Sequence, residues 1–286
     1  MITFPCCKIN LGLNVVNRRS DGYHDIETVF YPVPLCDALE VKLMDKDFPS
    51  DVDCDLLVKK NVDGRLVRCD MCAEQENLVV RAYNIIRNDF DIPRVHAHLI
   101  KNIPSEAGLG GGSSDAAAMI RLLDERFRLN MGIPEMERYA AKLGADCPFF
   151  ITSEPAFATG IGEKLRPVDR RMNPMQGYWI VLVKPDVAVS TAAAYKAITP
   201  GKPEECCADV VKLPVKEWRG RLTNDFEKPV FKTFPELRGI KEKLYECGAE
   251  FALMSGSGST IYGIFKDNPL DIKDIFNIHK VFVIRL

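Results

Sequence analysis

The stretch with the clearest chemical signature runs from Pro104 to Ala118 and reads PSEAGLGGGSSDAAA. It combines four glycines with the adjacent pair Ser113 and Ser114 and continues directly into helix-forming residues. Glycine permits backbone angles closed to other residues and lets a ligand approach the main-chain amides. Successive N–H groups that point one way bind anions, and the free N–H groups and dipole of a following helix add to this attraction. The stretch predicts a main-chain cradle for nucleotide phosphates, in which a side chain at Gly110 or Gly111 would crowd the phosphates.

Three other readings of this stretch fit the residues less well. A flexible linker would not run directly into the helix-forming segment Ala116–Ile120. A Walker A loop has Lys and then Ser or Thr after its last glycine, whereas Ser113 follows Gly112 here. A dinucleotide fingerprint places its first glycine at a strand end, and the predicted strand Val95–Lys101 ends well before Gly108. We therefore expect a phosphate site of another type.

Two acidic residues are candidates for taking a proton from a reacting hydroxyl. Asp146 lies in GADCPFF (Gly144–Phe150), where a proline stiffens the backbone and two phenylalanines exclude water. Asp115 falls in the first turn of the helix predicted after the glycines, where an Asp often serves only the helix dipole. A short, fixed carboxylate near a nucleophile can accept or orient its proton. We therefore favour Asp146 as the base.

Two further short segments have residue types suited to ligand binding. Tyr23 and His24 follow a turn at Asp21–Gly22 and could be ordinary residues at the start of a strand. An aromatic face beside a ring nitrogen is also what a nucleobase needs for stacking and for hydrogen bonds to its edge. The loop SGSGS (Ser255–Ser259) exceeds a minimal two-residue hairpin turn, so we expect it to form a wall of the site rather than a plain turn.

The elements that must position these residues are mostly extended in the first hundred residues. Ile9, Leu11, Leu13 and Val15 alternate with polar or small residues, which predicts a half-buried strand. Asn77 predicts a helix start by capping. The remaining predicted elements of this half are strands His24–Val33, Ala38–Met44, Asp55–Lys60 and Val95–Lys101, and helices over Asn77–Phe90, from the glycines to about Phe127, and after Pro134.

In the second half of the chain, predicted strands alternate with predicted helical segments. Its predicted elements are strand Tyr178–Lys184, helical segments Thr191–Ile198, about Lys212–Phe234 and Pro235–Cys247, strands Glu250–Met254 and Thr260–Phe265, helix Leu270–Ile278 and strand Val281–Arg285. With the helical segments counted as one layer, the order β–α–β–β–α–β is that of a ferredoxin-like unit. The polar segment Arg166–Gln176 marks the joint, which divides the chain into domains 1–168 and 169–286.

Composition restricts the class of protein. With 286 residues, 47% apolar residues and a net charge of −2, the chain can bury a sizeable core and shows no nucleic-acid or anionic-membrane footprint. No secretory signal and no membrane-spanning apolar run is visible. We therefore expect the ten cysteines to be reduced thiols in a cytoplasmic protein. Cys69 and Cys72, with Cys54 upstream, lack the partners that a zinc site requires.

Three stretches together resemble the motifs of a known family of small-molecule kinases. They are Lys8–Phe30 (KINLGLNVVNRRSDGYHDIETVF), Pro104–Ala118 and Gly248–Ile264 (GAEFALMSGSGSTIYGI). Their sequence and order are similar to those of the GHMP kinases, named for galactokinase, homoserine kinase, mevalonate kinase and phosphomevalonate kinase. KINLGL with RRSDGYH resembles one branch of that family, as do GADCPFF and NDFE (Asn224–Glu227). Departures from the pattern are Cys7, Ser20 and Tyr262, none of which touches the proposed chemistry.

The resemblance implies a fold and an activity. The fold is α+β with two domains: an N-terminal domain like ribosomal protein S5 domain 2, a ferredoxin-like C-terminal domain, and the active site in the cleft between them. The activity is transfer of the ATP γ-phosphate, with Mg²⁺ on the nucleotide, to the 2-hydroxyl of a cytidine diphosphate-linked methylerythritol. That reaction belongs to the non-mevalonate route to isoprenoid precursors. Its partners are small molecules, not nucleic acid or membrane.

The resemblance also implies residue roles. Lys8, which alone would read as a solvated edge lysine, becomes catalytic together with Asp146, whose charge it tunes. The implied ATP-binding residues are Pro104, Ser105, Glu106, Ala107, Gly108, Leu109, Gly110, Gly111, Gly112, Ser113, Ser114 and Asn77, the last near adenine as well as capping its helix. The implied substrate-binding residues are Asn10, Tyr23, His24, Thr191 and Tyr195, with Tyr195 as the face opposite Tyr23 and His24. No side chain is assigned to a metal.

Two rival functions are left open. One is another kinase of the same family, such as a mevalonate or homoserine kinase, against which the aromatic pair argues because those substrates carry no base. The other is a nucleotide-binding regulatory protein without catalysis. It would require the loss of Lys8 or Asp146, and both are present.

Overall fold

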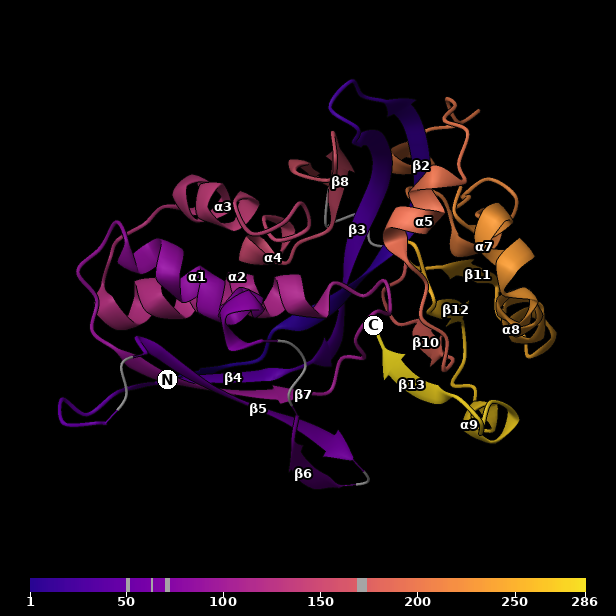
Figure 1. The fold of residues 1–286 in the computed structure, drawn as a ribbon. Helices are drawn as coiled ribbons and strands as arrows, with labels where there is room; N and C mark the ends of the chain where they lie inside the picture. The colour runs from indigo at the N-terminus through magenta and orange to yellow at the C-terminus, as the bar shows by residue number, and fades with distance from the viewer. Residues whose placement is uncertain (50–51, 63, 70–72, 169–173) are drawn as a thin grey trace. The chain divides into compact units, whose positions relative to one another are not determined.

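The structure is a computed structural model that describes residues 1–49, 52–62, 64–69, 73–168 and 174–286. The chain forms two compact units that interleave along the sequence and can be followed by colour in Figure 1. Unit 1 comprises Met1–Cys7, Leu35–Pro104 and Gly110–Ser153, and unit 2 comprises Lys8–Pro34, Ser105–Leu109 and Glu154–Leu286. The predicted division at residues 168 and 169 adjoins residues 169–173, which lie outside the described chain, and it stays a prediction.

Unit 1 is built on a five-stranded sheet. Its strand order is β1 (Ile2–Thr3), β4 (Ala38–Leu43), β7 (Val95–Lys101), β5 (Cys54–Val62) and β6 (Arg65–Arg68). Strand β7 runs antiparallel to β4 and parallel to β5. Buried residues alternate along β7 with partly exposed ones, as expected for a strand with one face on the core. Its last residue, Lys101, is the exception, because a charged side chain occupies a buried position.

The helices of unit 1 lie against this sheet, with α1 (Leu78–Arg87) and α2 (Gly111–Phe127) side by side on one face (Figure 1). They are accompanied by η1 (Glu74–Glu76), α3 (Ile133–Ala141) and α4 (Phe149–Thr152). Asn77 caps α1 as predicted: its side-chain oxygen accepts a hydrogen bond of 3.0 Å from the N–H of Val79. The helix ends at Arg87, three residues before the predicted Phe90.

Unit 2 contains two four-stranded sheets. One has the order β2 (Cys6–Arg18), β3 (His24–Cys36), β8 (Ala156–Thr159) and β9 (Lys164–Pro167). The other has the order β11 (Phe251–Met254), β12 (Ile261–Phe265), β10 (Trp179–Lys184) and β13 (Lys280–Arg285), with antiparallel pairs throughout. The helices are α5 (Thr191–Lys196), α6 (Cys207–Val210), η3 (Val215–Glu217), α7 (Glu227–Thr233), α8 (Pro235–Glu246) and α9 (Ile272–Ile275).

Two expectations about unit 2 are wrong, both because of packing between distant segments. Strand β2 is buried on both faces over most of its length rather than half-buried. The predicted helical run Lys212–Phe234 is interrupted, and α7 begins only at Glu227. The N–H of Leu13 donates to the carbonyl of Thr223 at 2.8 Å, and the N–H of Asp225 donates to the carbonyl of Leu13 at 2.9 Å. This pairing with β2 holds the segment extended.

No helix in the described ranges is long and apolar enough to cross a membrane.

Candidate functional site

The glycine loop (Ser105–Ser114) is divided between the units, and in unit 1 its second half, from Gly110, forms the start of α2. Gly110 is the N-cap residue and has φ = 70°, a left-handed conformation that glycine adopts without strain. The carbonyl of Gly110 accepts the N–H of Ser114 at 2.9 Å, so the helix is already formed by Ser114. The first N–H groups of a helix have no partner within it. Gly111, Gly112 and Ser113 therefore present main-chain donors at the positive end of a 17-residue helix.

Gly111 is closely packed on the side that faces the protein interior. A Cβ on Gly111 would lie 2.9 Å from Cγ2 of Ile103 and 3.3 Å from Nζ of Lys101, both in the protein interior. A side chain here would push α2 away from the end of β7, and the predicted crowding of phosphates stays a prediction. At Gly112 the nearest atom to a Cβ is 3.7 Å away, an ordinary contact.

Asp146 is half-buried. The next residue, Cys147, is buried and forms a side-chain hydrogen bond with Ser113. Burial raises the pKa of the Cys147 thiol to about 11, so it is neutral at physiological pH. The GADCPFF segment is thus attached to the glycine loop through Cys147, which leaves Asp146 as the ionisable group of this segment.

In unit 2, the first half of the glycine loop contacts the SGSGS loop. Gly108 has φ = 72°, and a Cβ on it would lie 2.9 Å from the carbonyl carbon of Ser255 and 3.1 Å from the carbonyl oxygen of Gly258. The hydroxyl of Ser255 donates to the carbonyl of Gly108 at 2.9 Å. The N–H of Thr260 donates to the carbonyl of Ala107 at 3.3 Å. The SGSGS loop therefore packs backbone to backbone against the first half of the glycine loop, beyond its role as the β11–β12 connection.

Lys8 and Asn10 belong to a buried polar network on β2 and β3. Lys8 is only 3% exposed, its Nζ donates to Oδ1 of Asn10 at 2.7 Å, and it lies 4.9 Å from the centre of the Phe30 ring. Nδ2 of Asn10 donates to Oγ1 of Thr28 at 2.9 Å. The N–H of Lys8 donates to the carbonyl of Leu109 at 3.0 Å, which links this network to the glycine loop. A buried ammonium requires such partners because desolvation disfavours its charge.

The predicted base-recognition residues fall into two groups. The rings of His24 and Tyr195 stack at a centroid distance of 5.1 Å and an interplanar angle of 23°. Tyr195 is held from the side by Phe226, whose ring lies at 4.8 Å and 89°. Thr191 hydrogen-bonds Ser257 of the SGSGS loop at 2.8 Å. Tyr23, by contrast, is 60% exposed.

The two predicted catalytic residues are in different units, Lys8 in unit 2 and Asp146 in unit 1. Asn77 is in unit 1, and the substrate residues Asn10, Tyr23, His24, Thr191 and Tyr195 are all in unit 2. The predicted pairing of Lys8 with Asp146 stays a prediction.

Asn224 is a structural residue of the site whose individual role sequence reasoning missed. It is 4% exposed, and its Nδ2 donates to the carbonyls of Met254 and Gly256 at 2.7 and 2.8 Å. Its Oδ1 accepts the N–H of Phe226 at 3.0 Å. Asn224 thus ties the SGSGS loop to the segment that carries Phe226. The NDFE motif was the available signal, but it gives no indication of which backbone groups the side chain satisfies.

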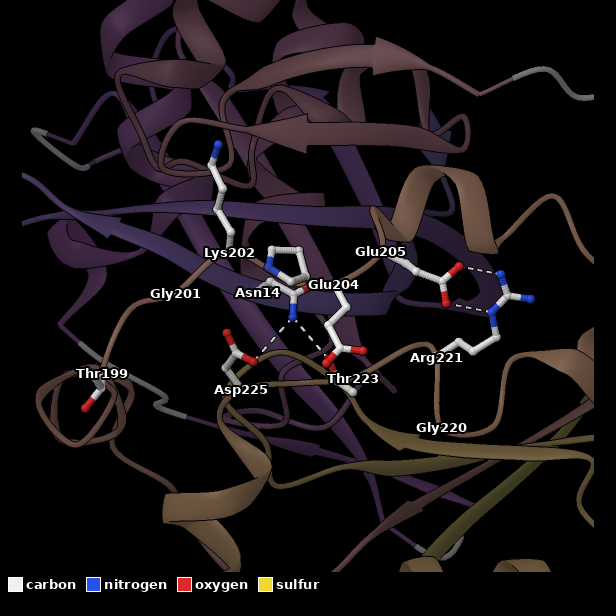
Figure 2. Close-up of a pocket in the computed structure, with 11 residues that line it drawn as sticks. Asn14, Thr199, Gly201, Lys202, Glu204, Glu205, Gly220, Arg221, Thr223 and Asp225 are labelled. Atoms are coloured by element: carbon white, nitrogen blue, oxygen red, sulfur yellow. Dashed lines mark hydrogen bonds and ion pairs between the residues drawn. The ribbon is translucent and has the colours of Figure 1, made fainter.

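A polar hollow of about 440 Å³ lies elsewhere in unit 2 (Figure 2). The residues that line it are Asn14, Thr199, Gly201, Lys202, Pro203, Glu204, Glu205, Gly220, Arg221, Thr223 and Asp225. Nδ2 of Asn14 donates to Thr223 at 3.1 Å and to Asp225 at 3.3 Å, and Arg221 forms two bonds with Glu205 (Figure 2). None of the predicted site residues lines this hollow.

The described residues contain no group of three or more His, Cys, Asp and Glu side chains that could hold a metal ion. Cys72 of the weak zinc candidate lies outside the described residues. Cys54 is buried and Cys69 is half-buried.

Two family models match the chain. The model of the GHMP kinases N terminal domain covers residues 77–154, which include Asn77, the glycine loop and Asp146. The model described as GHMP kinases C terminal covers residues 214–280, which include Asn224 and the SGSGS loop.

Relatives and solved structures agree with these matches. A protein of Parabacteroides distasonis named 4-diphosphocytidyl-2-C-methyl-D-erythritol kinase is 46% identical over 96% of this chain and 94% of its own length. A protein of the same name from Bacteroides fragilis is 47% identical over 93% of this chain and 92% of its own length. A crystal structure of 4-(cytidine 5'-diphospho)-2C-methyl-D-erythritol kinase is 29% identical, with a TM-score of 0.78 over 100% of this chain and 98% of that one. A mevalonate kinase structure is 12% identical and has a TM-score of 0.65 over 100% of this chain and 98% of that one. This likeness shows a shared fold. The chain belongs to the GHMP kinases and, within them, to the 4-diphosphocytidyl-2-C-methyl-D-erythritol kinase family.

Proposed function

We propose that this chain transfers the γ-phosphate of ATP to the 2-hydroxyl of 4-diphosphocytidyl-2-C-methyl-D-erythritol, a step towards isoprenoid precursors. The observation that carries the choice of substrate is the stacked pair His24 and Tyr195. A flat ring beside a histidine nitrogen suits a cytosine, whereas mevalonate and homoserine offer no base to stack. The names of the relatives that cover more than nine-tenths of this chain support the same substrate.

The glycine loop and the start of α2 are the proposed ATP site. Main-chain N–H groups at the positive end of a helix attract phosphate oxygens, and Gly110 provides the left-handed turn that exposes them. Asn77, at the start of α1, is the proposed neighbour of adenine. Magnesium would enter as part of MgATP, because Mg²⁺ is commonly held by substrate phosphates and water with few protein ligands.

The proposed chemistry assigns one role to each catalytic side chain. Phosphoryl transfer depends mainly on alignment and on charge stabilisation around the transferred group. Asp146 would accept the proton of the attacking hydroxyl, and Lys8 would neutralise developing negative charge. The hydrogen bond of Lys8 to Asn10 supports this role because it fixes the ammonium in a buried position.

We also propose the fold class of each domain and the cellular location of the protein. The antiparallel sheet β11–β12–β10–β13 with its helices supports a ferredoxin-like C-terminal domain, active together with an S5-like N-terminal domain. The described chain shows no disulfide among its nine cysteines, which supports a reducing, cytoplasmic location.

The test is ATP consumption by the purified chain with three acceptors: the cytidine diphosphate substrate, mevalonate and homoserine. We expect turnover with the first alone. Comparable turnover with mevalonate or homoserine would favour the rival kinases, and ATP binding without turnover of any acceptor would favour a regulatory protein.

A further inference from the structure

Three charged side chains meet inside unit 1 at the base of the glycine loop. Lys101 is the last residue of β7, Asp37 lies between β3 and β4, and Asp115 is in α2. They are 6%, 0% and 2% exposed, respectively. Charged residues are almost never this buried unless they are paired, and none of the three has been given a role in the reaction.

Hydrogen bonds join these residues into one cluster. Nζ of Lys101 donates to Oδ2 of Asp37 and, at 2.6 Å, to Oδ2 of Asp115. Oδ1 of Asp37 accepts the N–H groups of Asn102 and Ile103 at 2.5 and 2.8 Å. Asp37 thereby holds the backbone that leaves β7, and Lys101 connects that backbone to α2.

The cluster contacts the loop at Gly111. The site that a Cβ would occupy on Gly111 is 3.3 Å from Nζ of Lys101, so the ammonium lies directly under the first residue of α2. Any movement of Lys101 would change the support of the helix start. The N–H groups of Gly111 and Gly112, which are the proposed phosphate donors, would move with it.

The charge balance of the cluster shows how a phosphate site can tolerate two carboxylates beneath it. With both carboxylates ionised, the cluster would carry a buried net negative charge, which would repel phosphates. Burial, opposed by the charge of Lys101 and assisted by Asp37, raises the pKa of Asp115 to about 8. Oδ1 of Asp115 has no hydrogen-bond partner among the described residues, which agrees with a neutral acid rather than a buried anion.

We propose that Asp37, Lys101 and Asp115 are positioning residues that hold the start of α2, and with it the glycine loop, in the conformation that binds ATP. This inference rests on the proposed assignment of the loop to ATP. Lys101 binds Asp37, which holds the backbone at the end of β7, and the same ammonium binds Asp115, which anchors α2. None of the three needs to touch the nucleotide or the acceptor substrate.

The test compares Asp115→Ala with the conservative Asp115→Asn. Alanine removes the anchor and should raise the KM for ATP by roughly 10- to 100-fold, because small displacements of positioning groups have effects of this size. The KM for the cytidine diphosphate substrate should stay unchanged. Asparagine retains an oxygen acceptor of the same size as the neutral acid, so it should restore the KM for ATP to within a few-fold of the unmodified protein.

Arg87→Met is the matched control. Arg87 forms an ion pair of 3.1 Å with Asp53 at the far end of α1 in the same unit. Its loss should lower the melting temperature only, and we expect no change in the KM for ATP. If Asp115→Ala does not fold, the double variant Asp37→Asn/Lys101→Met removes the Lys101–Asp37 ion pair and should show the same selective rise in the KM for ATP.

The measured KM values and melting temperatures decide between a positioning role and a purely stabilising one. A lower melting temperature with an unchanged KM for ATP in Asp115→Ala or the double variant overturns the proposal and leaves a purely stabilising ion cluster. An equal rise in the KM values of both substrates overturns it as well. Failure of the unmodified protein to bind ATP would instead refute the proposed function, and calorimetric titration with ATP distinguishes the two cases.

Discussion

Gly108 and Ser255, separated by 147 positions in the sequence, are held together by a hydrogen bond from the Ser255 hydroxyl to the Gly108 carbonyl at 2.9 Å. The backbones approach so closely that a Cβ on Gly108 would lie 2.9 Å from the carbonyl carbon of Ser255. This contact joins the first half of the glycine loop to the SGSGS loop within unit 2. It makes Gly108 a structural requirement of the site, independent of any ligand.

Gly108→Ala should therefore destabilise the protein. The added methyl group meets rigid backbone, and φ = 72° is unfavourable for alanine; together these cost roughly 2–5 kcal/mol. Gly239→Ala is the control, since no atom lies within 4 Å of its Cβ position in α8, and alanine favours a helix. Thermal unfolding should show a clear drop for the first variant and none for the second. Equal melting temperatures would contradict the observed contact.

The His24–Tyr195 stack predicts separate effects on affinity and base choice. Stacking contributes roughly 1–3 kcal/mol per base and is insensitive to which base stacks. Tyr195→Ala should raise the KM for the cytidine diphosphate substrate without admitting its uridine analogue. His24→Ala should relax the choice of base, because hydrogen bonds to the base edge carry that choice. Steady-state kinetics with both analogues checks this, and equal turnover of both by the unmodified protein would be incompatible with it.

Asp146→Asn tests the assignment of the base. Loss of a general base lowers the rate by about 10²–10⁴-fold, so kcat should fall by this factor while ATP and the acceptor still bind. Asp115→Asn is the comparison: Asp115 is buried and hydrogen-bonded to Lys101, so the same change there should reduce kcat far less. Rapid-quench measurement of kcat, with binding followed by calorimetry, separates the two effects. A near-normal kcat for Asp146→Asn would require a different base.

Asp115 also predicts a pH dependence of stability. Its pKa is raised from 3.8 to about 8, chiefly by burial, so the folded state holds this proton more tightly than the unfolded state. The resulting stabilisation is fully present below the unfolded pKa and is lost as the pH rises through about 8. Asp115→Asn removes this dependence. Its melting temperature relative to the unmodified protein should be higher at pH 9 than at pH 6, and a constant difference would contradict the raised pKa.

Local sequence was sufficient where neighbours along the chain determine the structure. Strand β7 has the predicted bounds, Val95–Lys101, because its alternating residues bury one face. Asn77 caps α1 and α2 begins within the glycines as expected, since capping and left-handed turns depend on a few adjacent residues. The family motifs likewise lie in short continuous stretches, so membership of the GHMP kinases was readable from them.

The tertiary structure decided the features that depend on distant residues. Thr223 and Asp225 lie in a segment predicted as helical, but pairing with Leu13 of β2 makes it extended. Lys101 reads as an ordinary strand end until Asp37 and Asp115, from separate segments, are brought to its ammonium. Periodicity and capping report only on neighbours within a few positions. Burial, hydrogen-bond partners and shifted pKa values arise from side chains that meet only when the chain folds, and these alone revealed the cluster beneath the glycine loop.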